Sequence, residues 1–429
     1  MRILHKTITA LGLGLLLSAT NAQTTVAANV RQITLAEALI AASQNIDAQI
    51  AKQQMLASRA DITAANHAPA PMLSTSISQI DLQNGVGAGS WLGDKRVDKS
   101  LGIDWTWERG DKRTLRTQAA TQTANASTQD LNEAVLQQKL LAQAAFFDLF
   151  AAQERLEQIK NIAQSAQQLA SAAAKRLAAG DLSSQDAARS NIEFQRAQND
   201  ITLAEQDRAR AELALNLVLD AGSQKLIAVK LESASSQIQI PPEAAATALP
   251  AIESRADVQA ANARVEAARA QLNNALALQK SDVTLGTAID HFPGTSNRLL
   301  MFRMQMPLQI GALGGYTFQG EIDRARAQLT TAEAQLERVR HSATNEALRL
   351  TQELKSSQQR AQNYQLQIAP EAKRIADLAE LAYNKGALSL TDLLEARRTW
   401  RATTLEAIAA QLDFEKARAA RDIRMEVQK

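Results

Sequence analysis

Cysteine is absent from all 429 residues of the chain. Its absence excludes a disulfide-linked scaffold, thiolate metal ligands and a lipid-modified N-terminal cysteine. Aromatic residues make up only 3% of the chain, and there are only 17 glycines and 8 prolines. A compact enzyme of this size normally has a larger aromatic core. The composition instead indicates long helices that pack through narrow seams of small residues.

A strong charge of one sign is also lacking. The chain has 47 Lys and Arg against 45 Asp and Glu, a net charge of +2, which gives no signal for nucleic-acid binding. Beyond the N-terminal region no segment is apolar enough for a transmembrane helix, although β-strands could still enter an outer membrane. Nucleophile motifs, glycine-rich phosphate loops and paired catalytic carboxylates are missing from the sequence. We therefore expect neither an enzyme nor a bound cofactor.

The N-terminus reads as an export signal. In residues 1–22, "MRILHKTITALGLGLLLSATNA", two basic residues precede an apolar run from about Ile8 to Leu17, and small residues follow. This pattern predicts a signal peptide that is cleaved after Ala22, or alternatively after Ala28. The run is shorter than the ~20 residues of a membrane-spanning helix, and a buried N-terminal helix is the other alternative.

Two halves of the chain have the same order of parts. The segment 35–66, "LAEALIAASQNIDAQIAKQQMLASRADITAAN", aligns with 245–276, "ATALPAIESRADVQAANARVEAARAQLNNALA", at a separation of 210 residues. A repeat this long indicates a duplicated domain half. We therefore divide the mature chain into residues 23–240 and 241–429, with Pro241 in the linker between them.

Each half is predicted to contain one very long helix. No Pro or Gly occurs between Lys112 and Ala178, and apolar residues recur there at helical spacing. About 67 residues at ~1.5 Å each span ~100 Å. The counterpart in the second half runs from about Gly320 to Lys385, with a possible kink at Pro370. Helices of this length need partners along their sides.

Both long helices end in the same kind of turn. "RLAAGDLSSQDAARSNIEF" at 176–194 matches "AYNKGALSLTDLLEARRTW" at 382–400, and equivalent residues of the two turns are 206 positions apart. The glycines are predicted to terminate the long helices, and the serines to cap the helices that return. The paired residues are Gly180 with Gly386, Leu182 with Leu388 and Ser183 with Ser389.

Between the helices lie segments that alternate in the manner of β-strands, at 71–108 and 281–307. Each strand has one apolar and one mostly polar face, and each is close to the ~9–11 residues that cross a bilayer. Residues 71–82 form the weakest of the four. The residues predicted to face lipid are Leu101, Ile103, Trp105, Trp107, Val283, Leu285, Ile289, Leu300, Phe302 and Met304.

Four such strands cannot close a barrel, and an open sheet edge is not viable in lipid. The chain must therefore take strands from copies of itself. Three copies would supply twelve strands and enclose a pore with the polar faces inside. The predicted fold class is mainly α with a small β part.

The whole pattern resembles the TolC family of outer-membrane efflux proteins, and the resemblance covers almost all of the mature chain. Three segments carry the resemblance. "ITLAEAL" near the N-terminus is similar to the family's "LTLAEAL", and the other two are "SRADVQAANARVEAARAQL" after the midpoint and "YNKGALSLTDLLEARRTW" near the end. The resemblance implies a homotrimer in which a twelve-stranded outer-membrane barrel continues into an α-helical tunnel across the periplasm. It also implies that the two tips meet a periplasmic adaptor and an inner-membrane pump.

The resemblance further implies that the second tip forms a gate. Asp392 and Glu395 match acidic residues that ring the closed entrance in family members, and Tyr383 matches a tyrosine of the closed gate in some members. Arg189 stands where Glu395 lies in the other half, so the two tips differ in charge. Alternatively, the two acidic residues only favour the first turn of a helix.

A narrower resemblance is to the CzcC-like branch, which serves metal exporters of the resistance-nodulation-division type. "WERGDKRTLRTQAA" at 107–120 is similar to the "ELGGKR" motif of that branch, with Arg109 and Asp111 in place of usual residues. Heavy-metal cations are therefore a possible cargo, with drug or organic-solute export and type I secretion as alternatives. A periplasmic coiled-coil adaptor or scaffold is the alternative from another class.

A resident metal site is not expected. Strand alternation separates Met301 from Met304 and Met306, so these three cannot converge as soft ligands within one strand. The four histidines lie far apart with no ligand spacing.

Overall fold

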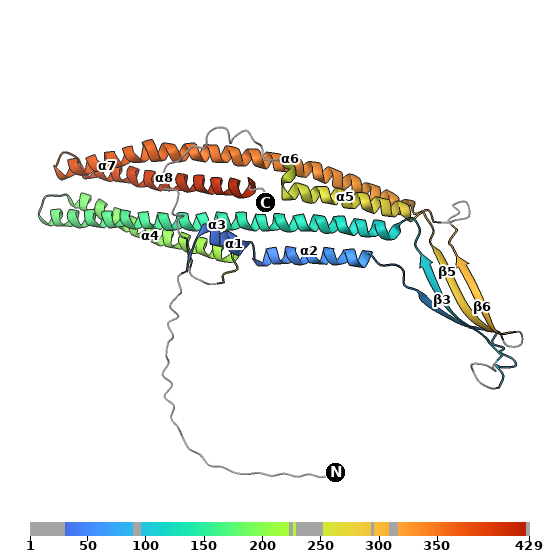
Figure 1. Cartoon of the computed structure of the whole chain (residues 1–429). Helices are drawn as coiled ribbons and strands as arrows, with labels where there is room; N and C mark the ends of the chain where they lie inside the picture. Colours follow the sequence, from blue (N-terminus) through green and yellow to red (C-terminus); the bar gives the residue numbers. More distant parts are fainter. Residues whose placement is uncertain are drawn as a thin grey trace, which may run out of the picture.

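The structure, a computed structural model, describes residues 31–88, 96–222, 226–228, 252–292, 296–308 and 316–425. The described helices run side by side in one elongated bundle, with a small sheet at one end and two helical hairpin tips at the other (Figure 1). The predicted signal peptide and the linker around Pro241 lie outside the described residues.

The two repeats share the same order of main parts, which is a helical segment, two strands, a long helical segment and a returning helix. The first comprises β1 (Arg31–Ile33), α1 (Leu35–Ala42), α2 (Ile46–Ala65), β2 (Met72–Ser78), β3 (Asp98–Trp107), α3 (Lys112–Ala178), α4 (Ser184–Val218) and β4 (Leu226–Ala228). The second comprises a 3₁₀ turn (Ile252–Ser254), α5 (Ala256–Ala277), β5 (Val283–Phe292), β6 (Ser296–Gln305), α6 (Gln319–Asn363), a π-helical turn (Tyr364–Ile368), α7 (Ala369–Asn384) and α8 (Leu390–Met425).

The segment 35–66, which opens the first repeat, is divided into the helices α1 and α2. Thr34 begins α1 with a capping box, in which its side chain accepts from the Glu37 backbone N–H and the Glu37 carboxylate accepts from the Thr34 N–H. Asn45 then caps α2 through its side-chain oxygen. The break occurs at Asn45 because its side chain offers the backbone N–H of Ala48 an alternative hydrogen-bond partner, which starts a new helix.

Helix α3 is a single 67-residue helix with the predicted bounds. It contacts α2 and α5 towards the sheet, and α4 and α8 towards the tips, so it receives the lateral support that a helix of this length needs. Its counterpart is interrupted by the π turn rather than by a kink at Pro370 itself. Proline lacks an N–H and its ring would clash with the carbonyl of Leu366 in an α-helix, and the wider turn relieves both problems.

The four predicted strands form one antiparallel sheet in the order β2-β3-β5-β6. The predicted apolar face is exposed on the chain: Trp105 is 57% and Phe302 is 79% accessible. Leu101, Ile289 and Leu300 lie in one cross-strand row of this face. Val283 is the exception and a correction to the prediction, because it is only 7% exposed. It is the first residue of β5, where the sheet meets the helices and the chain covers it.

The opposite face of the sheet carries a polar row. Arg303 on β6 donates to both oxygens of Asp104 on β3, at 2.5 and 2.7 Å. Gly286 on β5 lies between them in the register, and a Cβ there would come within 2.0 Å of the Asp104 Oδ1. Glycine is therefore the residue that allows this ion pair to form across an intervening strand.

The first repeat lies on one edge of the chain and the second on the other edge, at three levels. In the sheet the outer strands are β2 and β6. Beside the sheet the contacts run α2-α3-α5-α6, and towards the tips they run α4-α3-α8-α7. Each level thus has four elements, and the outer two of these form the edges of the chain.

None of the helices in the described residues combines the length and the apolar character that a membrane crossing requires.

Candidate functional site: the paired hairpin tips

The two tips have the same backbone geometry. Gly180 and Gly386 have φ values of +82° and +74°, in the left-handed region that glycine adopts without strain. The N–H of Asp181 donates to the Arg176 carbonyl, and the N–H of Ala387 donates to the Ala382 carbonyl, both at 2.9 Å. These six-residue bonds are Schellman motifs, so the predicted role of the glycines as helix terminators is confirmed.

The returning helices also begin alike. Ser183 and Ser389 accept from the N–H groups of Asp186 and Asp392, at 3.1 and 3.2 Å, and each serine hydroxyl donates back to the aspartate. Asp392 is therefore an N-terminal capping partner, as its equivalent Asp186 is. Leu182 and Leu388 are half-buried, and Leu388 packs against the Leu390 cluster inside the second tip.

Glu395 differs from its neighbour Asp392 in having no capping role. Its side chain is 71% exposed, and its closest cation is Arg398 on the same helix, at 3.6 Å. Both acidic residues are exposed on the first turns of α8. They are available to face other copies of the chain, which is a requirement of the predicted gate.

Tyr383 joins the second tip to the first. Arg176 donates to the Tyr383 hydroxyl at 3.0 Å, and its guanidinium carbon lies 5.3 Å from the centre of the tyrosine ring. Arg189, the residue that distinguishes the first tip, donates to the Thr391 hydroxyl at 2.8 Å. The structure thus places two of the sequence-selected residues, Tyr383 and Arg189, in contacts between the hairpins.

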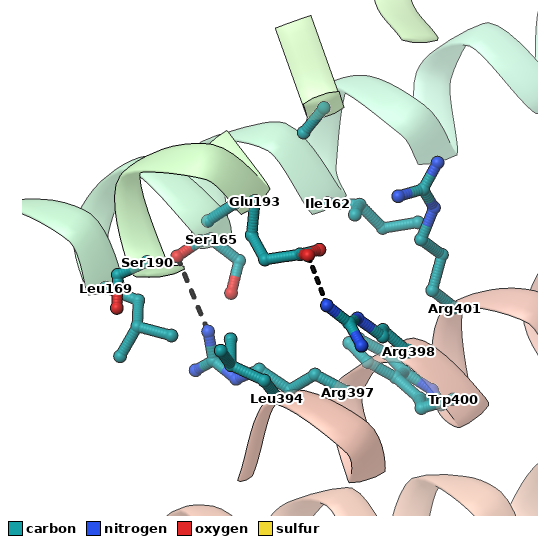
Figure 2. Close-up of a pocket in the computed structure, with 12 residues that line it drawn as sticks. Ile162, Ser165, Leu169, Ser190, Glu193, Leu394, Arg397, Arg398, Trp400 and Arg401 are labelled. Atoms are coloured by element: carbon teal, nitrogen blue, oxygen red, sulfur yellow. Dashed lines mark hydrogen bonds and ion pairs between the residues drawn. The ribbon is translucent and has the colours of Figure 1, made fainter. Parts of the chain in front are cut away.

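Further pairs between the hairpins were missed by the sequence analysis. A groove runs along α3 between α4 and α8, and Figure 2 shows its part near the tips. Arg398 of α8 pairs with Glu193 of α4 across this groove, and Arg401 pairs with Asp200. Arg397 donates to the Ser165 carbonyl on α3 at 3.5 Å. The run "RRTWR" at 397–401 was the available signal, because three closely spaced arginines on one helix need acidic or carbonyl partners.

Glu193 is held in its charged form by these arginines. Burial alone would raise the pKa of its carboxyl group, but the hydrogen bond and charge of Arg398, together with Arg196, lower that pKa below its ordinary value. Its side chain is only 15% exposed. Glu193 is therefore more enclosed than Asp200, the other carboxylate paired across the groove, and it stays charged at neutral pH.

Within the described residues, no group of three or more His, Asp or Glu side chains is arranged to hold a metal ion. The chemistry that the tips offer is thus charge, hydrogen bonding and shape at the end of a helical bundle.

Residues 250–420 match the family model described as outer membrane efflux protein. The second repeat of the chain therefore resembles this family. The cobalt-zinc-cadmium resistance protein CzcC of Cupriavidus metallidurans is 24% identical to the chain over 371 residues, which cover 86% of the chain and 84% of CzcC.

Solved outer-membrane proteins share the fold of the chain. The outer membrane protein VceC of Vibrio cholerae superposes with a TM-score of 0.72 at 17% identity, over 91% of the chain and 95% of VceC. The CmeC outer membrane channel of Campylobacter jejuni gives a TM-score of 0.74 at 16% identity, over 91% of the chain and 85% of CmeC. The predicted fold class, long helices with a small sheet, is confirmed.

Proposed function

We propose that the chain forms a homotrimeric outer-membrane efflux channel that passively conducts cargo from an inner-membrane pump and a periplasmic adaptor to the exterior. The observation that carries this proposal is the four-element order at three levels of the chain. Because β2 and β6 each have one unpaired edge, three copies would close a twelve-stranded barrel. The helices would continue the same ring of twelve at both lower levels.

The outer helices carry apolar side chains that a ring would cover. Leu203 and Leu217 on α4 are 52% and 79% exposed, and Ile375 and Leu378 on α7 are 45% and 51% exposed. Helix α4 lies on one edge of the chain and α7 on the other. A head-to-tail contact of α4 with α7 of the next copy would bury both stripes and close into a ring.

The tips are the proposed inner entrance and the docking end. Gly180, Leu182, Ser183, Gly386, Leu388 and Ser389 would shape the surface that meets the adaptor. Asp392 and Glu395 would form stacked acidic rings around the threefold axis, and Tyr383 would help to hold the entrance closed. Such rings attract cations and repel anions at a constriction.

Heavy-metal cations are the proposed cargo, delivered by a pump of the resistance-nodulation-division type. The support is the similarity to CzcC over most of both chains. The proposed location is an outer membrane of the Gram-negative type, reached by means of the N-terminal signal peptide.

The channel is tested with the full chain purified from membranes. We expect trimers that resist heating in detergent and single-channel conductance in planar bilayers. Monomers without conductance would contradict the proposal, and recovery from the soluble periplasmic fraction would favour an adaptor or scaffold. For the cargo, cells that produce the chain together with an adaptor and a metal pump of the resistance-nodulation-division type should tolerate higher zinc, cobalt or cadmium concentrations. Unchanged metal tolerance with raised drug tolerance would favour the drug-efflux alternative.

A further inference from the structure

The segment 107–116, "WERGDKRTLR", leads from β3 into α3 where the sheet meets the helical bundle (Figure 1). It contains four basic and two acidic residues. Lys280 and Asp282, which precede β5, lie beside this segment, because the N–H of Arg109 donates to the Asp282 carboxylate at 3.0 Å. Together these residues have five basic side chains and three acidic ones, an excess of two positive charges.

Two of the five basic side chains are used within the fold. Lys112 has a side chain that is only 8% exposed, and it pairs with Asp282 at 2.8 Å. Arg116 pairs with Glu108 at 2.6 Å and also donates to backbone carbonyls near the end of α2. These pairs neutralise two of the three acidic residues. Asp111, the third, is exposed and has no ion pair among the described residues.

Arg109 and Lys280 are exposed and have no acidic partner among the described residues. The Arg109 guanidinium donates to the sulfur of Met306 at 3.5 Å, so its side chain crosses the end of β5, which lies between β3 and β6. The Lys280 side chain lies against the next residue, because a Cβ at Gly110 would come within 2.6 Å of the Lys280 Cδ. Two neighbouring cations are thus left without a counter-charge. Arg113 is a third, but it donates to a side-chain oxygen at the end of α2.

Exposed aromatic residues lie at the same level in both repeats. Trp107 is the last residue of β3, on the apolar face, and is 59% exposed. Phe318 precedes α6 with a φ of +57°, as Asp111 precedes α3 with a φ of +58°, so Tyr316 is the equivalent of Arg109. Tyr316 is 60% exposed. Tryptophan and tyrosine gather at the headgroup level of membrane β-barrels, which assigns this level to the end of the sheet.

We propose that Arg109 and Lys280 bind the phosphate of an anionic phospholipid, of the phosphatidylglycerol type, in the membrane leaflet on the helix side of the sheet. A guanidinium can donate two parallel hydrogen bonds to phosphate oxygens, and Lys280 adds a compact second charge. Trp107 contacts the glycerol region of the same lipid. A zwitterionic headgroup carries an ammonium group that the excess positive charge repels. The inference rests on the proposed function only in placing the sheet in a membrane.

The site is tested by native mass spectrometry of the full-length chain in detergent. Phosphatidylglycerol, phosphatidylcholine or inorganic phosphate is added, and the dissociation constant of the first bound molecule per chain is measured. We expect phosphatidylglycerol to bind most tightly. Arg109→Gln and Lys280→Gln should each weaken its binding roughly fivefold, and phosphatidylcholine binding should not change. Arg109→Lys with Lys280→Arg retains both charges and should retain most of the preference.

Arg338→Gln with Lys355→Gln is the matched control. It removes two exposed cations of α6 that have no ion pair among the described residues, so the loss of net charge is the same. It should leave phosphatidylglycerol binding unchanged. Raising the salt concentration tests the unmodified chain directly, because salt screens exposed charges and should reduce the preference for the anionic lipid.

A preference for phosphatidylglycerol that survives in the Arg109→Gln, Lys280→Gln double variant would overturn the proposal. An equal loss in the α6 control would also overturn it, because net charge alone would then explain the preference. Inorganic phosphate bound as tightly as the lipid would mean a site for free anions. A chain that binds neither lipid contradicts the membrane location and the site together. A chain that conducts ions but binds both lipids alike contradicts the site alone.

Discussion

Asp257 and Glu346 remain charged because two arginines are committed to them. Burial alone would raise the pKa of each carboxyl group, but hydrogen bonds from Arg255 and the charge of Arg424 lower the pKa of both below the ordinary value. Both groups thus bind protons more weakly in the folded chain than in the unfolded one. Their contribution to the free energy of unfolding is complete above the ordinary carboxyl pKa range and is lost as pH falls through the lowered values.

Removing the Arg424 charge should therefore change both stability and its pH dependence. Arg424→Met leaves Glu133 without its arginine and leaves Asp257 and Glu346 with Arg255 alone, and we expect a loss of about 3–5 kcal/mol at pH 7. The midpoint of acid unfolding, followed by circular dichroism, should move towards neutral pH. Arg264→Gln, which breaks the exposed ion pair with Asp130, should lower the free energy of unfolding by only about 0–1 kcal/mol. An acid-unfolding midpoint that is the same in both variants would show that the Arg424 ion pairs do not set the pH dependence of stability.

A side chain at position 286 is also expected to destabilise the sheet. Gly286→Ala places a methyl group within 2.0 Å of the Asp104 Oδ1, so the Asp104–Arg303 pair must separate. We expect oligomers that dissociate at a lower temperature on unboiled gels. Gly320→Ala is the matched control, because its nearest atom is 3.9 Å away in a helix. Adding Asp104→Ala to Gly286→Ala should restore part of the loss, and no restoration would argue against this clash as the cause.

At the scale of elements, the two tips provide their own internal comparison. Asp186→Ala and Asp392→Ala each remove one capping partner and should cost similar stability, about 1 kcal/mol. Only Asp392→Ala combined with Glu395→Ala should raise the resting conductance and weaken cation preference in planar bilayers. If Asp186→Ala changes conductance and selectivity by the same amount, the acidic residues act as caps and not as a gate.

The lengths and ends of the helices could be predicted because their signals are local. Helix α3 lacks Pro and Gly from Lys112 to Ala178, and both tips have glycine followed by a capping serine. The π turn could not be predicted, because Pro370 indicates only that the α-helix is disturbed and not how the backbone accommodates the proline. The division between α1 and α2 was missed because Asn45 lies within an otherwise helical pattern.

At the scale of the whole molecule, the exposed apolar face of the sheet defines its proposed depth in lipid. Phe302 is 79% exposed on this face. Phe302→Arg should impair membrane insertion, by up to about 2–4 kcal/mol if the residue lies at the bilayer midplane. Phe302→Leu is the control and should insert normally, as measured by the fraction of chain recovered with outer membranes. Equal recovery of both variants would mean that this face does not contact lipid.

Contacts between distant segments were beyond the reach of sequence patterns. Hydrogen bonds between charged side chains join Glu133, Arg255, Asp257, Glu346 and Arg424, and no spacing rule along the sequence connects these residues. The burial of Val283 likewise depends on how the sheet meets the helices, whereas alternation along β5 assigns only its face. The candidate gate residue Tyr383 could be selected from sequence by resemblance, but its partner Arg176 could not, and neither could the pairing of Arg189 with Thr391.

The length of helix α3 also sets the distance between the sheet and the tips. It is one 67-residue rod that lies beside α2 over its first part and beside α4 over its second. Seven residues added to α3 would lengthen it by about 10.5 Å, but the added turns would have no partner unless α2 or α4 grew equally. The second repeat would need the same change. The distance between the sheet and the tips can therefore vary among relatives only through matched insertions in several helices, so unmatched length changes should be confined to the loops.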